Sequence, residues 1–173
     1  MKKENIEILK NGGVGVIPTD TIYGLVGRAL NEEAVKRIVE IKNRSDGKGF
    51  IVLISSIKDL ETFGIKVTDP IKNILNKFWP GKVSVAFDDK RAFRFPDRPE
   101  LVEILKQTGP LVAPSANPEG QAPAKNIGEA QKYFNDKVDF YENGGEFDSA
   151  PSTLVKINNG KVEVLRQGAV NIL

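Results

Sequence analysis

Residues 14–26 of this 173-residue chain read VGVIPTDTIYGLV, in which two apolar runs are separated by hydroxyl residues and one carboxylate. The run at residues 14–17 is rich in β-branched residues and predicts a buried strand, and residues 21–26 favour a second strand directly after it. Ligands of α/β proteins commonly bind where strands end, so the polar residues between the runs are candidates for a pocket wall. An ordinary turn, in which Thr and Asp side chains cap backbone amides, is the alternative, and spacing alone favours it.

The rest of the chain alternates between helical spacing and short apolar runs. Helices are predicted over residues 6–10, 31–43, 56–63, 69–78, 100–108 and 127–134. Further strands are predicted over residues 50–54, 83–87, 92–95, 111–113, 138–141, 153–157 and 162–165. Asn158-Asn159-Gly160 is typical of a hairpin between the last two strands, so the sheet is expected to be mixed. The chain has no repeat and no long linker, and residues 1–173 are therefore expected to form a single α/β domain.

The composition excludes several kinds of catalytic centre. The chain has no cysteine and no histidine. Disulfides, thiolate nucleophiles, Ser-His-Asp triads and the usual structural zinc sites are therefore excluded, and chemistry must use carboxylates, Lys, Arg, hydroxyls, backbone amides or a hard metal. The 25 Lys and Arg residues nearly balance 23 Asp and Glu, which is not the balance of a dedicated nucleic-acid binder. No apolar run approaches the roughly 20 residues of a membrane span, so we expect a cytoplasmic protein without a membrane partner.

A cationic stretch follows the second predicted helix. Lys42, Arg44 and Lys48 fall within the segment KNRSDGKGF at residues 42–50, which also contains two glycines. Cations at the end of a helix stabilise its dipole, and this is one interpretation. The other is a phosphate-binding site, with a planar fork from Arg and point charges from Lys. The segment lacks the frame of a Walker A loop, and the motif alone leaves the two interpretations about equal.

Three later segments carry polar residues at predicted strand ends. Ser115 and Asn117 lie in a Pro- and Gly-rich stretch after the strand at 111–113, where an Asn-Pro turn is the alternative interpretation. Ser152 directly precedes the strand predicted over residues 153–157, and Arg166 follows the last predicted strand. Arg94 stands between two phenylalanines on a short strand, so its side chain points to the opposite face, which on this pattern could be the solvent face.

Taken in order, these segments resemble the YrdC-like family of threonylcarbamoyl-AMP synthases, which act in tRNA modification. The resemblance extends from about residue 12 to residue 168 of the chain. It rests on PTDTIYGL at 18–25, KNR at 42–44 with Lys48, FWPG at 78–81, RFP at 94–96, SAN at 115–117, PST at 151–153 and RQG at 166–168. The implied fold is a twisted mixed sheet of about seven strands with surrounding helices and a concave basic face.

The resemblance also implies a reaction and its site residues. The family condenses L-threonine, bicarbonate and ATP to threonylcarbamoyl-AMP, releases pyrophosphate, and passes the product to a threonylcarbamoyl transferase complex, so contact with tRNA is mostly indirect. Mg²⁺ is expected with ATP. The resemblance assigns no acid–base, nucleophile or metal-ligating residue. The implied ATP contacts are Lys42, Arg44, Lys48, Ser115, Asn117 and Arg166; the implied threonine contacts are Thr21, Arg94 and Ser152; the implied pocket walls are Tyr23 and Leu53.

Two departures from the family pattern lie near the cationic stretch. Lys48-Gly49-Phe50 stands where many relatives have Lys-Pro-Leu, and Leu53 stands where many have a histidine in the amino-acid pocket. Two alternative functions remain open at this point. One is a non-catalytic RNA-binding paralogue that uses the concave basic face, and the other is a carbamoylating paralogue of the hydrogenase-maturation type, whose chains are much longer.

Overall fold

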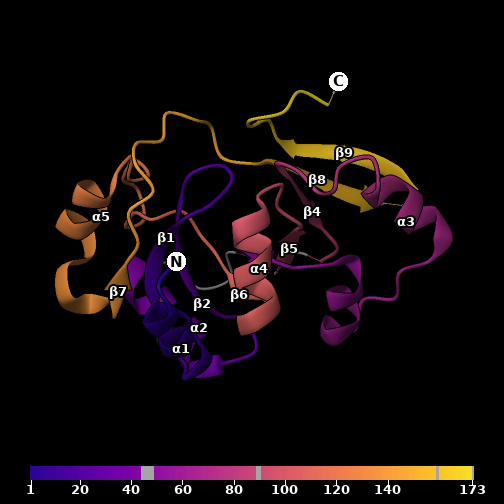
Figure 1. The fold of residues 1–173 in the computed structure, drawn as a ribbon. Coiled ribbons are helices and arrows are strands. Elements are labelled where there is room, and N and C mark those ends of the chain that lie inside the picture. Colours follow the sequence, from indigo (N-terminus) through magenta and orange to yellow (C-terminus); the bar gives the residue numbers. More distant parts are fainter. Residues whose placement is uncertain (44–48, 89–90, 159, 173) are drawn as a thin grey trace.

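The computed structural model describes residues 1–43, 49–88, 91–158 and 160–172, shown in Figure 1. Its strands form one nine-stranded sheet in the order β7-β1-β2-β6-β3-β5-β4-β8-β9. The strands are β1 (Gly15–Pro18), β2 (Tyr23–Arg28), β3 (Phe50–Leu53), β4 (Val83–Ala86), β5 (Arg91–Arg94), β6 (Leu111–Val112), β7 (Phe140–Tyr141), β8 (Thr153–Asn158) and β9 (Lys161–Arg166).

Each strand segment predicted from the residues overlaps one observed strand, so the predicted α/β fold is confirmed. The sheet is mixed, because β1 pairs antiparallel with β2 whereas β3 pairs parallel with β5 and β4 parallel with β8. The resemblance implied about seven strands, and the described chain has nine. Two of the nine, β6 and β7, are only two residues long, and the other seven account for the expected number.

Six of the described helices lie where helical spacing predicts them, and the short η2 is not among the predicted segments. They are α1 (Lys3–Lys10), α2 (Glu32–Lys42), η1 (Ile57–Phe63), α3 (Asp69–Leu75), α4 (Pro99–Thr108), α5 (Ile127–Phe134) and η2 (Asn135–Lys137). The predicted N-cap Asn31 accepts a hydrogen bond from the Ala34 amide at 2.9 Å, and this bond satisfies one of the unpaired donors at the start of α2. None of the described helices is long and apolar enough to cross a membrane.

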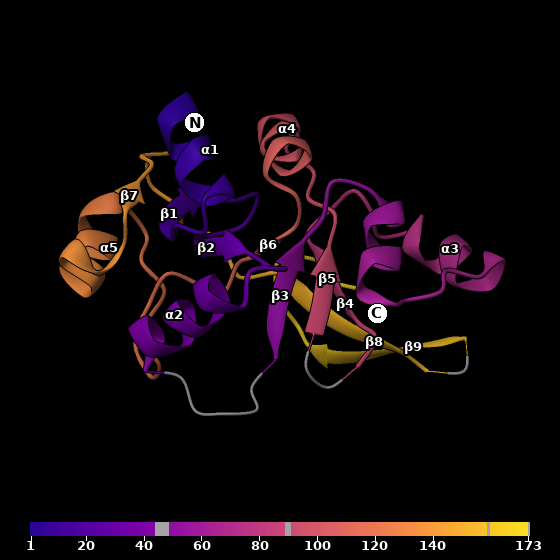
Figure 2. The same cartoon turned by 90° about the horizontal axis from the view of Figure 1, so that it is seen from below.

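Two apolar clusters pack on opposite faces of the sheet. One contains Val52 and Phe93 of the central strands together with residues of α2, α3 and α5. The other contains Leu53 and residues of α1 and α4, and Figure 2 shows these two helices side by side. Side chains alternate along a strand, so Ile51 and Arg94 share the second face with Leu53. The candidate site lies on this second face.

Candidate active site

Seven of the predicted site residues line one pocket of about 260 Å³, here called the Arg94 pocket. These seven are Thr21, Tyr23, Arg94, Ser115, Asn117, Ser152 and Arg166. They come from β2, β5 and β9, from the turn before β2, and from the segments that follow β6 and precede β8. Residues up to 145 positions apart in sequence (166 − 21) therefore meet at one place. The structure therefore brings these seven residues together, and their separate roles toward ATP and threonine stay predictions.

A second pocket of about 360 Å³, here called the Lys156 pocket, adjoins the first. Ile51, Ser115 and Arg166 line both pockets. The Lys156 pocket adds charged side chains, Asp88, Arg91 and Lys156, and apolar ones, Phe50, Leu154 and Leu165. The shared residues make the two pockets parts of one trough, with a hydroxyl and a guanidinium between them.

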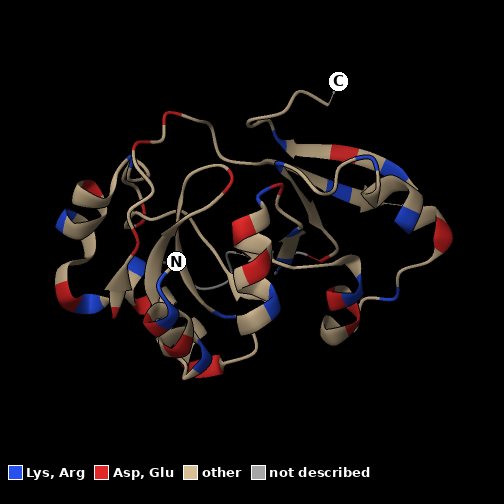
Figure 3. Ribbon diagram, viewed as in Figure 1, with Lys and Arg blue, Asp and Glu red and all other residues tan. Residues whose placement is uncertain are grey.

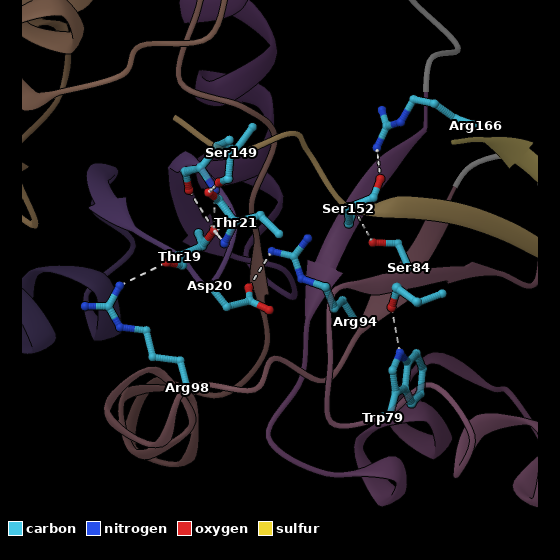
Figure 4. Close-up of polar contacts among 12 residues, drawn as sticks. Thr19, Asp20, Thr21, Trp79, Ser84, Arg94, Arg98, Ser149, Ser152 and Arg166 are labelled. Atoms are coloured by element: carbon cyan, nitrogen blue, oxygen red, sulfur yellow. Dashed lines mark hydrogen bonds and ion pairs between the residues drawn. The ribbon is translucent and has the colours of Figure 1, made fainter. Parts of the chain in front are cut away.

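The PTDT segment is both a tight turn and a wall of the Arg94 pocket. The Thr19 hydroxyl donates to the Ile22 carbonyl oxygen at 2.6 Å and accepts from the Thr21 amide at 3.1 Å. Arg98 donates to the Thr19 carbonyl oxygen at 2.9 Å, and the Ser149 hydroxyl donates to the Thr21 carbonyl oxygen, as Figure 4 shows. The segment is therefore a turn as well as a pocket wall, because Thr19 caps the turn and both Thr19 and Thr21 line the pocket. The interpretation of Asp20 as a cap of backbone amides is wrong, since its carboxylate pairs with Arg94 instead.

Arg94 is buried and paired. Its side chain is 4% exposed, and Nη2 lies 3.0 Å from Oδ1 of Asp20, whose side chain is 2% exposed (Figure 4). Burial lowers the pKa of Arg94 from its ordinary value, and the charge of Asp20 opposes that change. The guanidinium remains charged, since an arginine pKa lies far above neutrality. The alternation of β5 does turn Arg94 away from Phe93, but the solvent-face interpretation is wrong because the PTDT turn lies over that face.

Ser152 and Arg166 are joined to the same wall of the pocket. The Ser152 and Ser84 hydroxyls share a hydrogen bond of 2.8 Å, and Arg166 Nη2 donates to the Ser152 carbonyl oxygen at 2.9 Å. Burial lowers the pKa of Arg166. A side chain on Gly168 would overlap the backbone of Pro151 and Ser152, so the RQG turn needs glycine to approach Ser152.

Ser115 and Asn117 belong to a turn whose backbone accepts hydrogen bonds from Lys42. Nζ of Lys42 donates to the carbonyl oxygens of Ser115 at 2.5 Å and Asn117 at 2.6 Å. Asn117 Nδ2 donates to the carbonyl oxygens of Pro118 at 3.0 Å and Gln121 at 2.8 Å. These two bonds fix the orientation of the amide, because a flipped amide would set its oxygen against two carbonyl oxygens. The Asn-Pro turn interpretation is therefore correct, and Asn117 still lines the Arg94 pocket.

The other predicted residues lie apart from the pockets or outside the described chain. Arg44 and Lys48 lie outside the described residues. Lys42 is described, and it is not among the residues that line either pocket. Leu53 packs in the cluster under α4 with Leu101 and Leu105, beside Arg94 in the β3–β5 register, and it does not line either pocket. Tyr23 is a pocket wall, and its hydroxyl accepts from the Gly144 amide and donates to the Gly145 carbonyl oxygen, both at 2.8 Å.

Sequence reasoning gave Asp20 no ionic partner, and it assigned no role to Ser84 or Lys156. Ser84 left a signal, since it is the one polar residue in the apolar run VSVAF at residues 83–87. Asp20 stands inside the quoted PTDT motif, but its partner Arg94 is 74 residues away (94 − 20), and spacing cannot reveal such a pair. Lys156 lies in β8, two residues after Leu154, which lines the same pocket, and strand periodicity alone could have indicated that the two share a face.

The described residues include no group of three or more Asp, Glu, His or Cys side chains that could hold a metal ion. Mg²⁺ usually keeps several waters and binds through one or two carboxylates plus substrate phosphates. Asp88 is the one carboxylate among the described residues that line the two pockets, and it forms an ion pair with Arg91 at 2.9 Å. These residues do not form a magnesium site of the protein's own, and no step is assigned to the ion.

Comparison with known proteins gives the family. The Sua5/YciO/YrdC family model, described as "Telomere recombination", matches residues 7–168, which is most of the chain. The chain belongs to this family. A Marinobacter nauticus member named threonylcarbamoyl-AMP synthase is 32% identical over 143 residues, which cover 74% of this chain and 75% of that protein.

Two solved structures share the family fold. The crystal structure of P. abyssi Sua5 complexed with L-threonine has a TM-score of 0.86 and 27% identity, and it covers 95% of this chain. This chain spans about half the length of that Sua5, since the match covers 53% of it. E. coli YciO has a TM-score of 0.85 over 98% of this chain and 89% of its own, and at 23% identity it supports the fold alone.

Proposed function

We propose that this protein is an L-threonylcarbamoyladenylate synthase, which joins L-threonine, bicarbonate and ATP and releases pyrophosphate for threonylcarbamoyladenosine modification of tRNA. The observation that carries the proposal is the Arg94 pocket, where one buried guanidinium and two hydroxyl residues, Thr21 and Ser152, adjoin a second cationic pocket. The name of the Marinobacter relative and the L-threonine in P. abyssi Sua5 support the same activity.

The Arg94 pocket has the size and chemistry for the amino acid. Its volume of about 260 Å³ lies just below the roughly 300–1,000 Å³ typical of pockets for drug-sized ligands. A guanidinium binds a carboxylate through two parallel hydrogen bonds, so Arg94 is the proposed partner of the threonine carboxylate. Thr21 and Ser152 supply hydroxyl groups for the polar remainder of threonine. Tyr23 forms part of the wall.

The Lys156 pocket is the proposed place of the nucleotide. Its cations, Arg91, Lys156 and Arg166, suit phosphates, and its apolar residues suit a base. Ser115 and Arg166 line both pockets, so the α-phosphate is proposed to lie beside them, next to the amino acid. Asn117 is proposed as the second turn residue near the phosphates. Arg44 and Lys48 remain proposed contacts of the triphosphate.

The proposed chemistry needs no protein nucleophile. The threonine amine combines with bicarbonate to give a carbamate and water, and a carbamate oxygen then attacks the α-phosphorus. The bond from that phosphorus to the bridging oxygen breaks, and pyrophosphate leaves with its electron pair. Alignment of carbamate and ATP in adjoining pockets supplies rate by proximity, and the surrounding cations stabilise the departing charge. The absence of histidine and cysteine from the sequence is compatible with this route.

Several parts of the proposal concern partners. The product is proposed to pass to a threonylcarbamoyl transferase complex in the cytoplasm, with tRNA contacted mostly through that complex, and Mg²⁺ is proposed to arrive bound to ATP. The RNA-binding alternative is less well supported. Figure 3 colours positive and negative residues mixed along the helices and β9, and the relatives' names describe a synthase.

Calorimetry with L-threonine tests the assignment of the Arg94 pocket. Wild-type protein is expected to bind L-threonine, and Arg94→Lys, which keeps the charge but loses the planar fork, is expected to bind it roughly tenfold more weakly. ATP titration of the same variant is the control and should change little. Equal affinity of both proteins for L-threonine would contradict the assignment.

A further inference from the structure

Lys42 is a buried cation that donates two hydrogen bonds to a turn. Its residue is 3% exposed, and Nζ lies 2.5 Å from the Ser115 carbonyl oxygen and 2.6 Å from that of Asn117. A charge placed in the interior needs hydrogen-bonding partners, and bonds in which the donor is ionised are the stronger kind. Two backbone oxygens thus accept hydrogen bonds from Lys42, and Lys42 does not line either of the two pockets.

Lys42 both donates hydrogen bonds to this turn and accepts one from it. Lys42 is the last residue of α2, and its carbonyl oxygen accepts a hydrogen bond from the Glu119 amide at 2.8 Å. α2 is itself fixed to the sheet, since Ala34 and Ile38 pack in the large apolar cluster. Three hydrogen bonds therefore tie residues 115–119, called the SAN turn below, to the end of a helix that packs against the sheet.

The pocket side of the SAN turn depends on this attachment. Ser115 lines both pockets and Asn117 lines one. The two carbonyl oxygens that Lys42 holds point toward Nζ. Carbonyl oxygens that faced a triphosphate would repel it, so an attachment that keeps them on Lys42 favours anion binding.

We propose that Lys42 is a positioning residue that holds the SAN turn in place for the nucleotide, and that it acts through Ser115 and Asn117 rather than as a direct phosphate contact. This inference rests on the proposed function where ATP is concerned. It differs from the phosphate-binding role that the cationic stretch suggested for Lys42. The two roles make different predictions for the ligand-free protein.

Amide hydrogen exchange on ligand-free protein provides the first test. Lys42→Met is expected to speed exchange at the Ala116 and Glu119 amides, because the turn loses its attachment, while residues of β1 exchange as before. Lys36→Met, at an exposed position of α2, is the matched control and should leave the turn unchanged. Unaltered exchange in Lys42→Met would overturn the proposal. If that variant does not fold, Lys42→Gln, which keeps one donor, is used in its place, with the same expected result.

A double-mutant cycle of ATP affinity provides the second test. Lys42→Met and Ser115→Ala are each expected to weaken ATP binding, by roughly tenfold for Lys42→Met, and the double variant should bind about as weakly as the weaker of the two. If the loss of ATP affinity in the double variant equals the product of the losses in the two single variants, the proposal is overturned. That result would mean that Lys42 contacts the nucleotide independently of Ser115. Circular dichroism at the assay temperature checks that every variant is folded. Wild-type protein without ATP affinity would refute the proposed function, whereas the exchange test of Lys42 would still stand.

Discussion

Arg94 Nη2 lies 3.0 Å from Asp20 Oδ1, and both side chains are almost fully buried beside the pocket proposed for L-threonine. Among the described residues, neither Asp20 oxygen nor Arg94 Nε has a hydrogen-bond partner of good geometry. The contact is therefore an ion pair rather than a two-point fork. Asp20 balances the charge of Arg94 while leaving guanidinium donors for a substrate carboxylate.

Removal of the Asp20 charge should destabilise the protein. Asp20→Asn leaves the Arg94 charge buried without a counter-charge, and loss of one partner of a buried pair costs about 3–5 kcal/mol. Urea denaturation followed by circular dichroism measures the change in the free energy of unfolding. The double variant Asp20→Asn/Arg94→Met should recover part of the loss. A single variant as stable as wild type would mean that the pair is not buried in solution.

Ser84 should affect the KM for threonine, because its hydroxyl is hydrogen-bonded to the hydroxyl of Ser152. Ser84→Ala removes the 2.8 Å hydrogen bond to the Ser152 hydroxyl, and a hydrogen bond contributes about 1 kcal/mol, which corresponds to roughly a fivefold rise in the KM for threonine. Steady-state kinetics with threonine varied at saturating ATP measures this change, and the KM for ATP is the internal control. A rise confined to the KM for ATP would contradict the assignment of Ser152 to threonine and would indicate that it contacts ATP.

Leu53 should behave as a core residue rather than as a ligand contact. It is fully buried with Leu101 and Leu105, so Leu53→Ala should lower the free energy of unfolding by about 2–5 kcal/mol. The affinity for L-threonine, measured on the folded variant by calorimetry, should stay within about twofold of wild type. A stable variant with greatly weakened threonine binding would show that Leu53 forms the pocket wall that its alignment with a family histidine implied.

Acid should weaken the contact between α2 and Asp139, the residue just before β7. Partial burial raises the pKa of Asp139, but hydrogen bonds from Arg37, at 2.6 and 2.9 Å, and from the Val14 amide at 2.7 Å outweigh it and hold the pKa below its ordinary value. The folded-state pKa is thus lower than the unfolded value of about 3.9, so ionised Asp139 stabilises the fold above that pH and the contribution is lost as the pH falls through the folded-state pKa.

Arg37→Met tests this linkage. The stability difference between wild type and variant should be largest near neutrality and should shrink as the pH falls below about 4. Urea denaturation at several pH values measures it, with the exposed Lys36→Met as a control for altered net charge. A difference that does not change with pH would exclude Asp139 as the titrating group.

The local sequence pattern predicted the strands and most of the helices well, because the spacing of apolar residues and the content of β-branched residues determine where these elements form. It also placed Arg94 on the face opposite Phe93, which the structure confirms. What covers that face depends on the PTDT turn, 74 residues earlier (94 − 20), and no local pattern carries that information. Lys42 is a similar case, since its partners Ser115 and Asn117 lie more than 70 residues away. Seven of the residues that the resemblance implied do line the Arg94 pocket, whereas the positions of Lys42 and Leu53, which line neither pocket, required the structure.

Pyrophosphate release tests the central claim most directly. With purified protein, ATP and bicarbonate, L-threonine should start release of pyrophosphate, and it should do so roughly tenfold faster than serine, which lacks one methyl group. Omission of bicarbonate should abolish the release. The same rate with serine, with glycine, without any amino acid or without bicarbonate would contradict the assignment of this chain as an L-threonylcarbamoyladenylate synthase.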